Sequence, residues 1–429
     1  MSDVELERIS KQTGFITRNS KLSAKDFLRM LLFDHLKVDR PSLQQHALEV
    51  QADSGKKVSK QAIDKKLNNA CVDFIKAIFE KFLSVKIEGE KILTTLDKKY
   101  TAVRIMDSTE FKLPDYFEND FPGYSKCNAP ACAAIQFEYD IISKKINCMA
   151  LSNARKSDKT YADEQMHTIN AGELIIRDLG YYSVESYNKI EAQNAFYVSR
   201  LKPGINISIK HNNDFKTISW SDIIKLIKQS KINHIDQVFY IGAEQKKEVR
   251  LIGWLLPQSE QQKRLERKRY KKGHINSDDV IRSQVNLFIT NIPAAELTIK
   301  QAYELYKIRW QIELLFKIWK SILKIHAVKK MKPERLKCYL YSKFIWILLC
   351  WDITMSFEFV VWKKFKELIS IYKCFHLLKD RSTAFKIILL GNKKKIKNLL
   401  QEVLQTFIDY GLKDDKKGKI KLKDLLQLT

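Results

Sequence analysis

The sequence predicts an α/β protein with a mixed-sheet core and a β-rich insertion, flanked by helical N-terminal and C-terminal regions. Apolar residues recur at helical spacing up to about residue 90, as short strand-like runs from about residue 100, and again at helical spacing from Thr298. Strand-like runs separated by helical patterns are typical of an α/β sheet. The 429 residues suit two to four domains, and the 45% hydrophobic content is enough to bury a large core.

Residues 1–95 are expected to form a helical, DNA-binding N-terminal domain. The stretch KDFLRMLLFDHL has helical apolar spacing, and Pro41 opens a second helix that ends at residues 53–55. Ser59 is an N-cap for the next helix, KQAIDKKLNNACVDFIKAIFEKFL. A helix, a glycine turn and a basic helix outline a helix-turn-helix, whose recognition helix would begin with Lys60, Gln61, Asp64 and Lys65. An ordinary helical hairpin explains the pattern equally well.

Residues 96–201 and 285–330 are expected to form the α/β core. VRIM (103–106) reads as a buried strand, and ACAAIQFEYDI and KINCMALSNA as an antiparallel pair joined at residues 143–145. ELIIRDLGYYS is an apolar run that stops at Asp178, and AFYVSRL is another strand. After the insertion, NLFITNIP (286–293) is expected to return to the core sheet.

Residues 202–284 are expected to form the β-rich insertion. KPGINISI and QVFYIGAEQKKEVRLIGWLL are strand-like, and a basic run, QQKRLERKRYKKG, follows them. Its cations are Lys263, Arg264, Arg267, Lys268, Arg269, Lys271 and Lys272, offset by Glu266 alone. Contact with a DNA backbone and a merely solvated helix face both remain open for this run.

Residues 331–429 are expected to be helical, and could dimerise, bind DNA or cap the fold. The most apolar stretch, Phe344 to Trp362, is broken by Asp352 and Glu358, which favours a buried helix over a membrane span. The first residues, MSDVELERISKQTG, contain no apolar signal core. Seven scattered cysteines without a C-x-x-C pair argue against a zinc ribbon or a disulfide framework. We therefore expect a cytoplasmic protein without membrane contact.

The charge balance indicates a polyanionic partner. The chain has 76 Lys and Arg against 50 Asp and Glu, a formal charge of +26. Each cation that neutralises a phosphate releases a counterion, so a chain of this charge favours nucleic acid. The alternative is a protein that is rich in lysine without binding nucleic acid.

One helix carries the most informative pattern, AYELYKIRWQIELLFKIWKSILKI. At roughly 100° per residue, its polar side chains fall within an arc of roughly 80°. Its opposite side is apolar, so we expect the helix to pack on the sheet. A buried helix does not normally keep a carboxylate next to cations and a phenol, which favours a functional role for the polar side. Plain i,i+4 ion pairs on an exposed face are the alternative. The polar residues are Tyr306, Arg309, Glu313, Lys317 and Lys320.

At these residues the sequence resembles the DDE transposases of bacterial insertion sequences, in the insertion-sequence-four group with the Y-R-E-K signature. Tyr306, Arg309, Glu313 and Lys320 match that signature at every position. The first two acidic motifs match Asp107 in RIMDSTEF and Asp178 in IIRDLGYYS. The order Asp, Asp, long insertion, Glu also matches, and the resemblance spans about residues 1–330. Alone, each Asp is more often a turn residue. Three other acids are weaker candidates because none directly follows an apolar run: Asp115, Asp120 and Asp163.

The resemblance implies that Asp107, Asp178 and Glu313 are catalytic and bind metal. Three adjacent carboxylates repel one another, and a divalent cation removes that repulsion. Oxygen-only ligands suit Mg²⁺ or Mn²⁺, and two ions about 4 Å apart can serve an in-line displacement at phosphorus.

The resemblance also implies a fold like ribonuclease H and cut-and-paste transposition. Water cuts at the inverted-repeat ends of double-stranded DNA, and the freed 3′ hydroxyl attacks target DNA. Tyr306, Arg309 and Lys320 would hold the terminal phosphate, and helix geometry adds Lys317. A homodimer would synapse the two ends. A stacking role known for a tryptophan in some relatives is not transferred to Trp254.

Two other functions remain open at this point. A non-catalytic DNA-binding protein derived from a transposase would bind the inverted repeats without cutting them. A host nuclease of the same fold would nick DNA or RNA without joining strands, although such an enzyme needs no dedicated clamp for a terminal phosphate.

Overall fold

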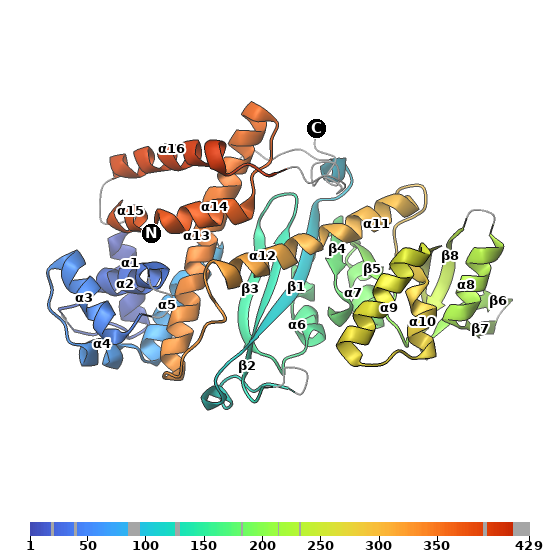
Figure 1. The fold of residues 1–429 in the computed structure, drawn as a ribbon, viewed down its shortest axis with the longest axis horizontal. Coiled ribbons are helices and arrows are strands. Elements are labelled where there is room, and N and C mark those ends of the chain that lie inside the picture. Colours follow the sequence, from blue (N-terminus) through green and yellow to red (C-terminus); the bar gives the residue numbers. More distant parts are fainter. Residues whose placement is uncertain are drawn as a thin grey trace.

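The structure is a computed structural model that describes the chain except for residues 19–20, 38–40, 85–94, 125–128, 182, 213, 231–232, 389–392 and 415–429. Figure 1 shows an elongated molecule with the N-terminal helices at one end, strands β1–β3 near the middle and the insertion at the other end. The long helix α13 runs beside the N-terminal helices.

The N-terminal region is helical, as the sequence predicts. Its helices are α1 (Asp3–Gln12), α2 (Ala24–Lys37), α3 (Leu43–Ser54), α4 (Lys60–Lys66) and α5 (Asn69–Ser84). The predicted caps are present, because the Ser59 side chain accepts the Ala62 N–H and Gly55 ends α3 at φ 69°. The prediction of one continuous helix after Ser59 is wrong. The chain breaks at Leu67, and the Asn68 side chain accepts the Cys71 N–H, which caps a separate α5.

The core strands lie where the apolar runs predict them. They are β1 (Ala102–Lys112), β2 (Cys132–Asp140), β3 (Ile146–Asn153), β4 (Glu173–Arg177) and β5 (Phe196–Arg200). β1 pairs with β2, and β2 with β3, in antiparallel register, whereas β1, β4 and β5 are parallel neighbours. The tight turn between β2 and β3 contains Lys144 at φ 61°. This strand order is that of a ribonuclease H-like fold, so the predicted fold class is confirmed.

The insertion extends the same sheet. Its strands are β6 (Ile207–His211), β7 (Asp214–Ile218), β8 (His234–Ile241) and β9 (Lys247–Leu255), and the chain returns through β10 (Val285–Thr290). β10 pairs with β5 on one side and β9 on the other, giving the order β3-β2-β1-β4-β5-β10-β9-β8-β6-β7. The helices here are α8 (Trp220–Gln229), α9 (Gln258–Lys272) and α10 (Ser277–Ser283).

Helices cover both faces of the sheet because strand side chains alternate in direction. Leu174 and Ile176 of β4 join the main core with α11 (Ile299–Ile308), α12 (Trp310–Ser321) and α13 (Pro333–Phe365). Ile175 points to the second core, which contains buried residues of α7 (Val184–Ala192) and α8. A smaller cluster places Tyr161 of α6 (Asp158–Glu164) against Met106 of β1.

The C-terminal region is also helical, with α14 (Ile371–Asp380), α15 (Ser382–Ile388) and α16 (Lys393–Tyr410) following α13. Among the described helices, α13 alone is long and apolar enough to cross a membrane by length and composition. In its most apolar window, 61% of the residues are buried inside the protein. Its Trp346 and Trp351 are 2% exposed, so α13 packs as a core helix, as its interrupting acidic residues predict.

Candidate active site

Two aspartates meet at the carboxyl end of β4 because their strands are parallel neighbours. The expectation that Asp107 follows its strand is wrong, because β1 continues to Lys112 and Asp107 pairs with Phe137 of β2. Met106 of β1 is in register with Arg177 of β4. Asp107 and Asp178 are the next residues on each chain segment, so they lie at the same level. Asp107 shares a side of β1 with Ile105, which packs in the core that contains α12. The positions of both aspartates follow from the two apolar runs that precede them.

The third acidic residue is carried by α12. α11 and α12 are separated only at Arg309, whose backbone remains helical at φ −49° and ψ −33°. The predicted apolar side of this helix is buried, with Ile308 and Ile312 fully enclosed. Glu313, in the first turn of α12, is half-buried and faces the two aspartates through Arg309.

The Arg309 guanidinium lies among all three carboxylates. Nη1 donates to Asp107 Oδ2 at 2.8 Å, and Nη2 donates to Glu313 Oε1 at 2.8 Å. Nε lies 3.7 Å from Asp178 Oδ1, too far for a hydrogen bond, and the Arg309 side chain is 8% exposed. Distant parts of the chain are therefore joined by one planar cation, whose fork of donors matches carboxylate geometry.

Burial sets the electrostatics of the cluster. It raises the pKa of Asp107 to about 7, although Arg309 and the Ser108 N–H favour the ionised form. Burial also raises the pKa of Tyr306 to about 12, with a further contribution from Asp178. Burial opposes the charge on Arg309, but the carboxylates outweigh it and raise the pKa of that guanidinium. The site therefore binds positive charge strongly at its centre.

The donor set fits a hard divalent cation. Asp107, Asp178 and Glu313 offer only oxygen atoms, and they already surround one positive charge, that of Arg309. In the described part of the chain, no three Asp, Glu, His or Cys side chains converge as a ready-made metal group. The carboxylates would therefore have to exchange contacts with Arg309 for contacts with a metal ion.

The other predicted phosphate-binding residues differ in their exposure and in their contacts. The Tyr306 hydroxyl donates to Asp178 Oδ1 at 3.4 Å, and its ring lies 5.8 Å from the Arg309 guanidinium carbon. Lys320 Nζ donates to the Glu110 carbonyl at 2.9 Å, and burial lowers its pKa. Lys317 is exposed on α12, and we see no contact between it and the acidic cluster among the described residues.

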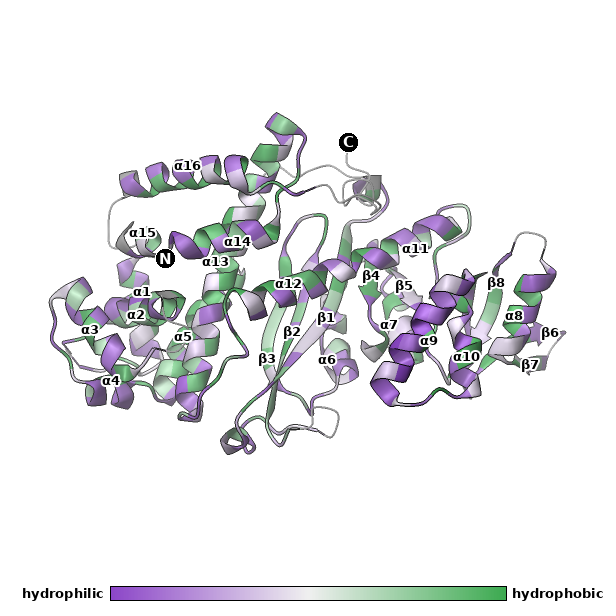
Figure 2. Ribbon diagram, viewed as in Figure 1, coloured by the Kyte–Doolittle hydropathy of each residue, from purple (hydrophilic) through white to green (hydrophobic). Residues whose placement is uncertain are grey.

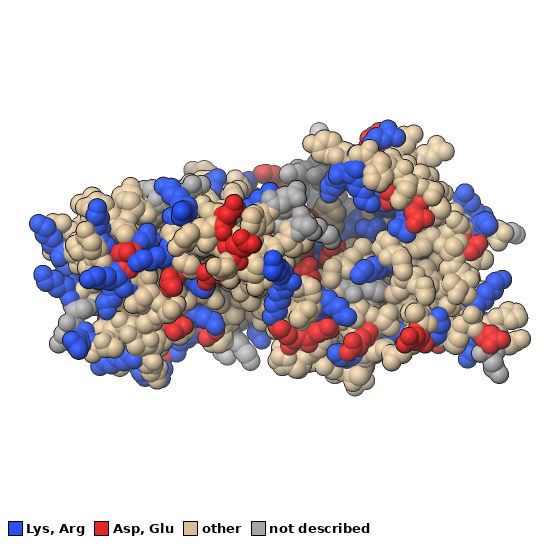
Figure 3. Space-filling view, turned by 90° about the horizontal axis from the view of Figure 1, so that it is seen from below, with Lys and Arg blue, Asp and Glu red and all other residues tan. Residues whose placement is uncertain are grey.

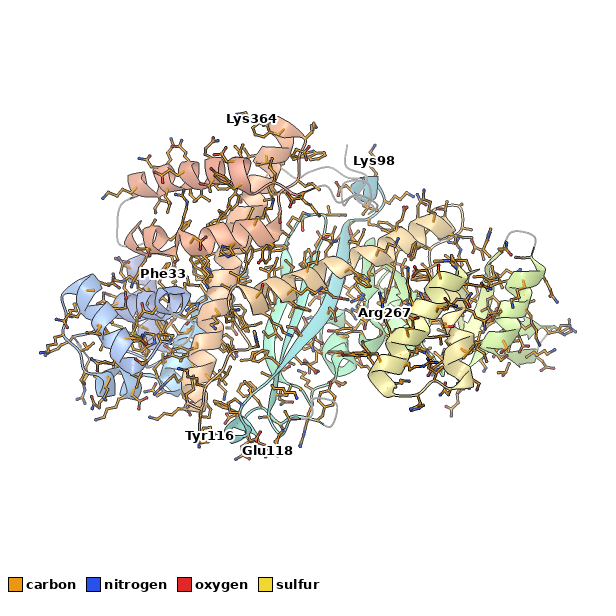
Figure 4. All side chains as sticks on the ribbon, viewed as in Figure 1. Phe33, Lys98, Tyr116, Glu118, Arg267 and Lys364 are labelled. Atoms are coloured by element: carbon orange, nitrogen blue, oxygen red, sulfur yellow. The ribbon has the colours of Figure 1, made fainter. Side chains whose placement is uncertain are left out.

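The weaker acidic candidates lie outside this cluster. Asp115 begins a short 3-10 helix after β1, at the lower tip of the molecule beside the labelled Tyr116 in Figure 4. Asp120 pairs with Lys337 at 2.8 Å, and Asp163 accepts a hydrogen bond from Ser186 at 3.0 Å. These are ordinary structural contacts.

Two basic segments that the sequence singled out, on α4 and α9, use some of their charged side chains in contacts within the protein. On α4, Asp64 pairs with Arg335 and with Lys332 at 2.9 Å, so this side of the predicted recognition helix faces the start of α13. On α9, Arg264 bonds to Asn286 Oδ1 at 2.6 Å and Lys268 to Asp279 Oδ1 at 2.5 Å, which anchor the helix. Arg267 and Lys271 remain exposed on α9. Figure 2 shows α9 as strongly hydrophilic along its length.

Sequence reasoning missed the buried polar residues that support the site. Arg104 of β1 donates to Glu173 at 2.9 Å and to Glu138 at 2.5 Å on the face opposite Asp107. Arg177, directly before Asp178, lies 3.7 Å from Glu138. Two arginines inside apolar strand runs were the signal, since a buried cation needs a partner.

Comparisons with known proteins agree on one family. Residues 100–349 match the family described as Transposase DDE domain. The chain is 30% identical to the transposase for insertion sequence element IS1151 of Clostridium perfringens, over 99% of this chain and 93% of that protein. It is 28% identical to the transposase for IS231E of Bacillus thuringiensis subsp. finitimus, over 98% of this chain and 92% of that protein. The IS231F transposase of Bacillus thuringiensis subsp. israelensis is 30% identical over 87% and 82%.

Proposed function

Because this chain belongs to the DDE-domain transposase family of insertion sequences, we propose that it cuts DNA at the inverted-repeat ends of its element and joins them to target DNA. The implied reaction is phosphodiester hydrolysis followed by transesterification, the cut-and-paste route. Hydrolysis leaves a 3′ hydroxyl at each element end. That hydroxyl then attacks a target phosphodiester, forming one bond to phosphorus as another breaks.

The acidic residues supply the metal ligands in this proposal. Asp107, Asp178 and Glu313 would hold Mg²⁺ or Mn²⁺, and two ions suit the reaction. When bound, such ions activate the attacking oxygen and stabilise the leaving one. Asp107 lies within β1 and Asp178 directly follows the parallel neighbour β4, so the sheet fixes their spacing, and Glu313 approaches from a packed helix. This rigid support favours an in-line geometry.

The polar side of α11 and α12 supplies the phosphate contacts. Arg309 presents a planar guanidinium and Tyr306 a buried hydroxyl at the acidic cluster, and Lys320, which donates to the Glu110 carbonyl, presents a point charge. Lys317, exposed on the same helix, would contact DNA outside the cluster. A DNA phosphate would compete with the carboxylates for Arg309, since both accept the same bidentate fork.

Each region of the chain has a different role in this proposal. Residues 1–95 bind DNA, residues 96–201 and 285–330 hold the catalytic core, and residues 202–284 form the insertion. Residues 331–429, which include helices α13 to α16, support a homodimer that brings two ends together. The cytoplasm of a bacterium, at the nucleoid, is the expected location.

One observation supports this function above the others: a single guanidinium contacts Asp107 and Glu313 at 2.8 Å while lying 3.7 Å from Asp178. Three acids from distant parts of the chain thus share one cationic centre. Two of these acids, Asp107 and Asp178, also match the first two acidic motifs of the family in order, and Glu313 matches the third.

The test is cleavage of DNA that carries the element's own inverted repeats, with Mg²⁺. Asp107→Ala, Asp178→Ala and Glu313→Ala should each abolish cutting while DNA binding persists. Asp115→Ala is the matched control, since this acid lies after β1 but outside the cluster, and it should cut normally.

The products distinguish the remaining functions. Strand-transfer joints identify a transposase, whereas simple nicks identify a nuclease. Binding without cutting by the unaltered chain would identify a non-catalytic, transposase-derived protein. Cutting that survives in all three alanine variants would refute the acidic site.

A further inference from the structure

Asp178 lies just outside the sheet, so its position depends on the turn that carries it. β4 ends at Arg177, and Asp178 leads into the short 3-10 helix Leu179–Tyr181. The Asp178 side chain is 44% exposed, and its Oδ1 lies 3.4 Å from the Tyr306 hydroxyl and 3.7 Å from Arg309 Nε. Both contacts are long for hydrogen bonds. Neither burial nor a short contact with α11 and α12 therefore fixes this carboxylate.

Tyr181 anchors the far end of the turn. Its backbone N–H donates to the Asp178 carbonyl at 3.1 Å, which closes the turn. Its side chain is 2% exposed and belongs to the same buried cluster as Met106, the residue before Asp107. Its hydroxyl donates to Gln136 Oε1 at 2.6 Å. One side chain thus joins the turn of Asp178 to the strands around Asp107.

Gln136 is the residue through which Tyr181 reaches the middle of the sheet. It lies in β2, is 1% exposed and pairs across the ladder with Ser108, the residue after Asp107. Its Nε2 donates to Asp158 Oδ1 at 2.9 Å, in the first turn of α6. Both polar atoms of this buried amide therefore have a partner, which fixes the orientation of the side chain.

Gly180 allows the same turn to approach α6 closely. A Cβ atom at this position would lie 2.8 Å from Asp158 Oδ2, which is too close for van der Waals contact. Asp158 therefore bonds to Gln136 with one oxygen and lies next to Gly180 with the other. Figure 1 shows α6 beside β1, so this helix supports the turn and the strand together.

These supporting residues lie on the face of the sheet opposite the acidic cluster. Asp107 shares a side of β1 with Ile105, whereas Met106 and Ser108 point to the other side. Tyr181, buried on that other side, does not contact DNA or an ion held by the acidic residues. Any effect of Tyr181 on the chemistry must pass through the backbone of the turn and the strands.

We propose that Tyr181 is a positioning residue that sets the distance between the Asp107 and Asp178 carboxylates. It does so by holding the turn of Asp178 on Gln136. This rests on the proposed function, in which both carboxylates hold metal ions. Asp107 lies in a strand and Glu313 in a helix, so Asp178 is the acid whose geometry depends on a turn. Two ions about 4 Å apart need ligands in a fixed geometry.

Tyr181→Phe removes only the hydroxyl, and Mn²⁺ binding to the full-length protein tests its role without requiring cleavage. Electron paramagnetic resonance measures free Mn²⁺, and the ions that Asp107→Ala fails to bind define the site. We expect Tyr181→Phe to weaken this binding about fivefold, less than the roughly 10–100-fold loss when a residue bonded directly to a metal ligand is removed.

Cleavage of end DNA provides a second readout. The Mg²⁺ concentration that gives the half-maximal rate should rise in Tyr181→Phe by about the same factor as the Mn²⁺ dissociation constant. A merely structural role would lower the amount of folded protein without moving this concentration. Urea unfolding of each variant identifies such a loss.

Two further variants test the route through Gln136. Gln136→Met replaces the amide with an apolar side chain of similar length and should weaken Mn²⁺ binding at least as much as Tyr181→Phe. The double variant should be no weaker than Gln136→Met alone, because both changes break the same bond. The matched control is Tyr161→Phe, a buried tyrosine of the same cluster whose hydroxyl contacts Cys148, and it should bind Mn²⁺ normally.

Different results would overturn different parts of the proposal. Normal Mn²⁺ affinity and an unchanged Mg²⁺ requirement in Tyr181→Phe would overturn the positioning role. Additive losses in the double variant would show that Tyr181 does not act through Gln136, and an equal loss in Tyr161→Phe would assign the effect to packing of the cluster. An unaltered protein that binds no Mn²⁺ at the acidic residues would instead refute the proposed function.

Discussion

At the scale of single residues, Arg309 is the centre of the candidate active site. Its guanidinium joins Asp107, Asp178 and Glu313 and is itself buried. Without it, three carboxylates would face one another in a site where burial already raises the pKa of Asp107 to about 7. The Y-R-E-K spacing suggested that Arg309 holds a DNA phosphate. In the structure, Arg309 contacts the acidic cluster instead, so the same residue has two sets of possible partners.

Replacing Arg309 tests this double role. Arg309→Gln should lower the rate of DNA-end cleavage at least 100-fold, because phosphate contact and the support of Asp107 and Glu313 are lost together. Single-turnover cleavage with Mg²⁺ measures it. Arg282→Gln, which breaks an i,i+4 pair with Asp278 on α10, should cleave normally. A cleavage rate for Arg309→Gln within threefold of the unaltered chain would contradict the role.

At the scale of elements, strand ends and helix sides position the chemistry. The parallel register of β1 and β4 fixes the two aspartates, and α12 brings Glu313 to the same face. Helix α13 packs in the same core with a mostly apolar surface. Asp352 is an acidic residue on this mostly apolar helix. Burial raises its pKa from 3.8 to about 6.

The pH dependence of stability should report Asp352. An acid with a raised folded-state pKa keeps its proton between about pH 4 and 6 after the unfolded chain has lost it. Its contribution therefore favours folding at low pH and is lost as the pH rises through about 6. Asp352→Asn should raise the free energy of unfolding at pH 7.5 by up to roughly 3 kcal/mol, because each tenfold change in proton affinity corresponds to roughly 1.4 kcal/mol.

Urea unfolding at pH 4.5 and pH 7.5 provides the measurement for Asp352→Asn. The gain should shrink strongly at pH 4.5, where the carboxyl is mostly protonated in the folded chain. Asp380→Asn, an exposed acid on α14, is the control and should show no such dependence. An equal effect at both pH values would mean that packing, not charge, is responsible.

At the scale of the whole molecule, buried ion pairs tie the two ends of the chain together. Lys386 of α15 is 2% exposed, and its Nζ lies 2.6 Å from Asp53, 3.0 Å from Glu49 and 3.3 Å from Asp34. These carboxylates outweigh the cost of burial and raise the pKa of Lys386. The C-terminal helices are thus anchored on α2 and α3.

Lys386→Ala should be strongly destabilising, by about 3–5 kcal/mol, because it removes the buried cation that three carboxylates share, one of them the buried Asp34. Guanidinium chloride unfolding gives the value. Lys373→Ala, which removes a lysine that pairs with the exposed Asp414, should cost less than about 1 kcal/mol. Similar losses for both lysines would show that the buried pairs add nothing beyond surface charge.

The charge of the molecule should govern its DNA affinity. Figure 3 shows Lys and Arg outnumbering Asp and Glu over the end formed by the N-terminal helices. At the other end, exposed Arg267 and Lys271 of α9 are proposed backbone contacts. The Arg267→Ala/Lys271→Ala variant should reduce the slope of log affinity against log salt by about 2, roughly one for each lost phosphate contact.

Fluorescence anisotropy over a salt series measures this slope. The Lys363→Ala/Lys364→Ala protein removes the same charge from α13 and should keep the original slope if α9 is the contact. Equal slopes for the α9 variant and the unaltered chain would leave α9 as a solvated helix face.

The sequence by itself determined the fold class and the family. Hydrophobic periodicity placed the strands, and the spacing from Tyr306 to Lys320 marked the polar side of one helix, because both depend on local backbone geometry. The break at Leu67 was not predictable from apolar spacing, since the Asn68 cap decides it.

Only the tertiary structure decided which charges meet. It joined Arg309 to carboxylates more than 100 residues away, separated Lys317 from them and turned Asp64 toward α13. Such contacts depend on the register between β1 and β4 and on the packing of distant helices. No local pattern encodes those long-range distances, and so the contacts that Arg309 makes within the predicted site became visible only in three dimensions.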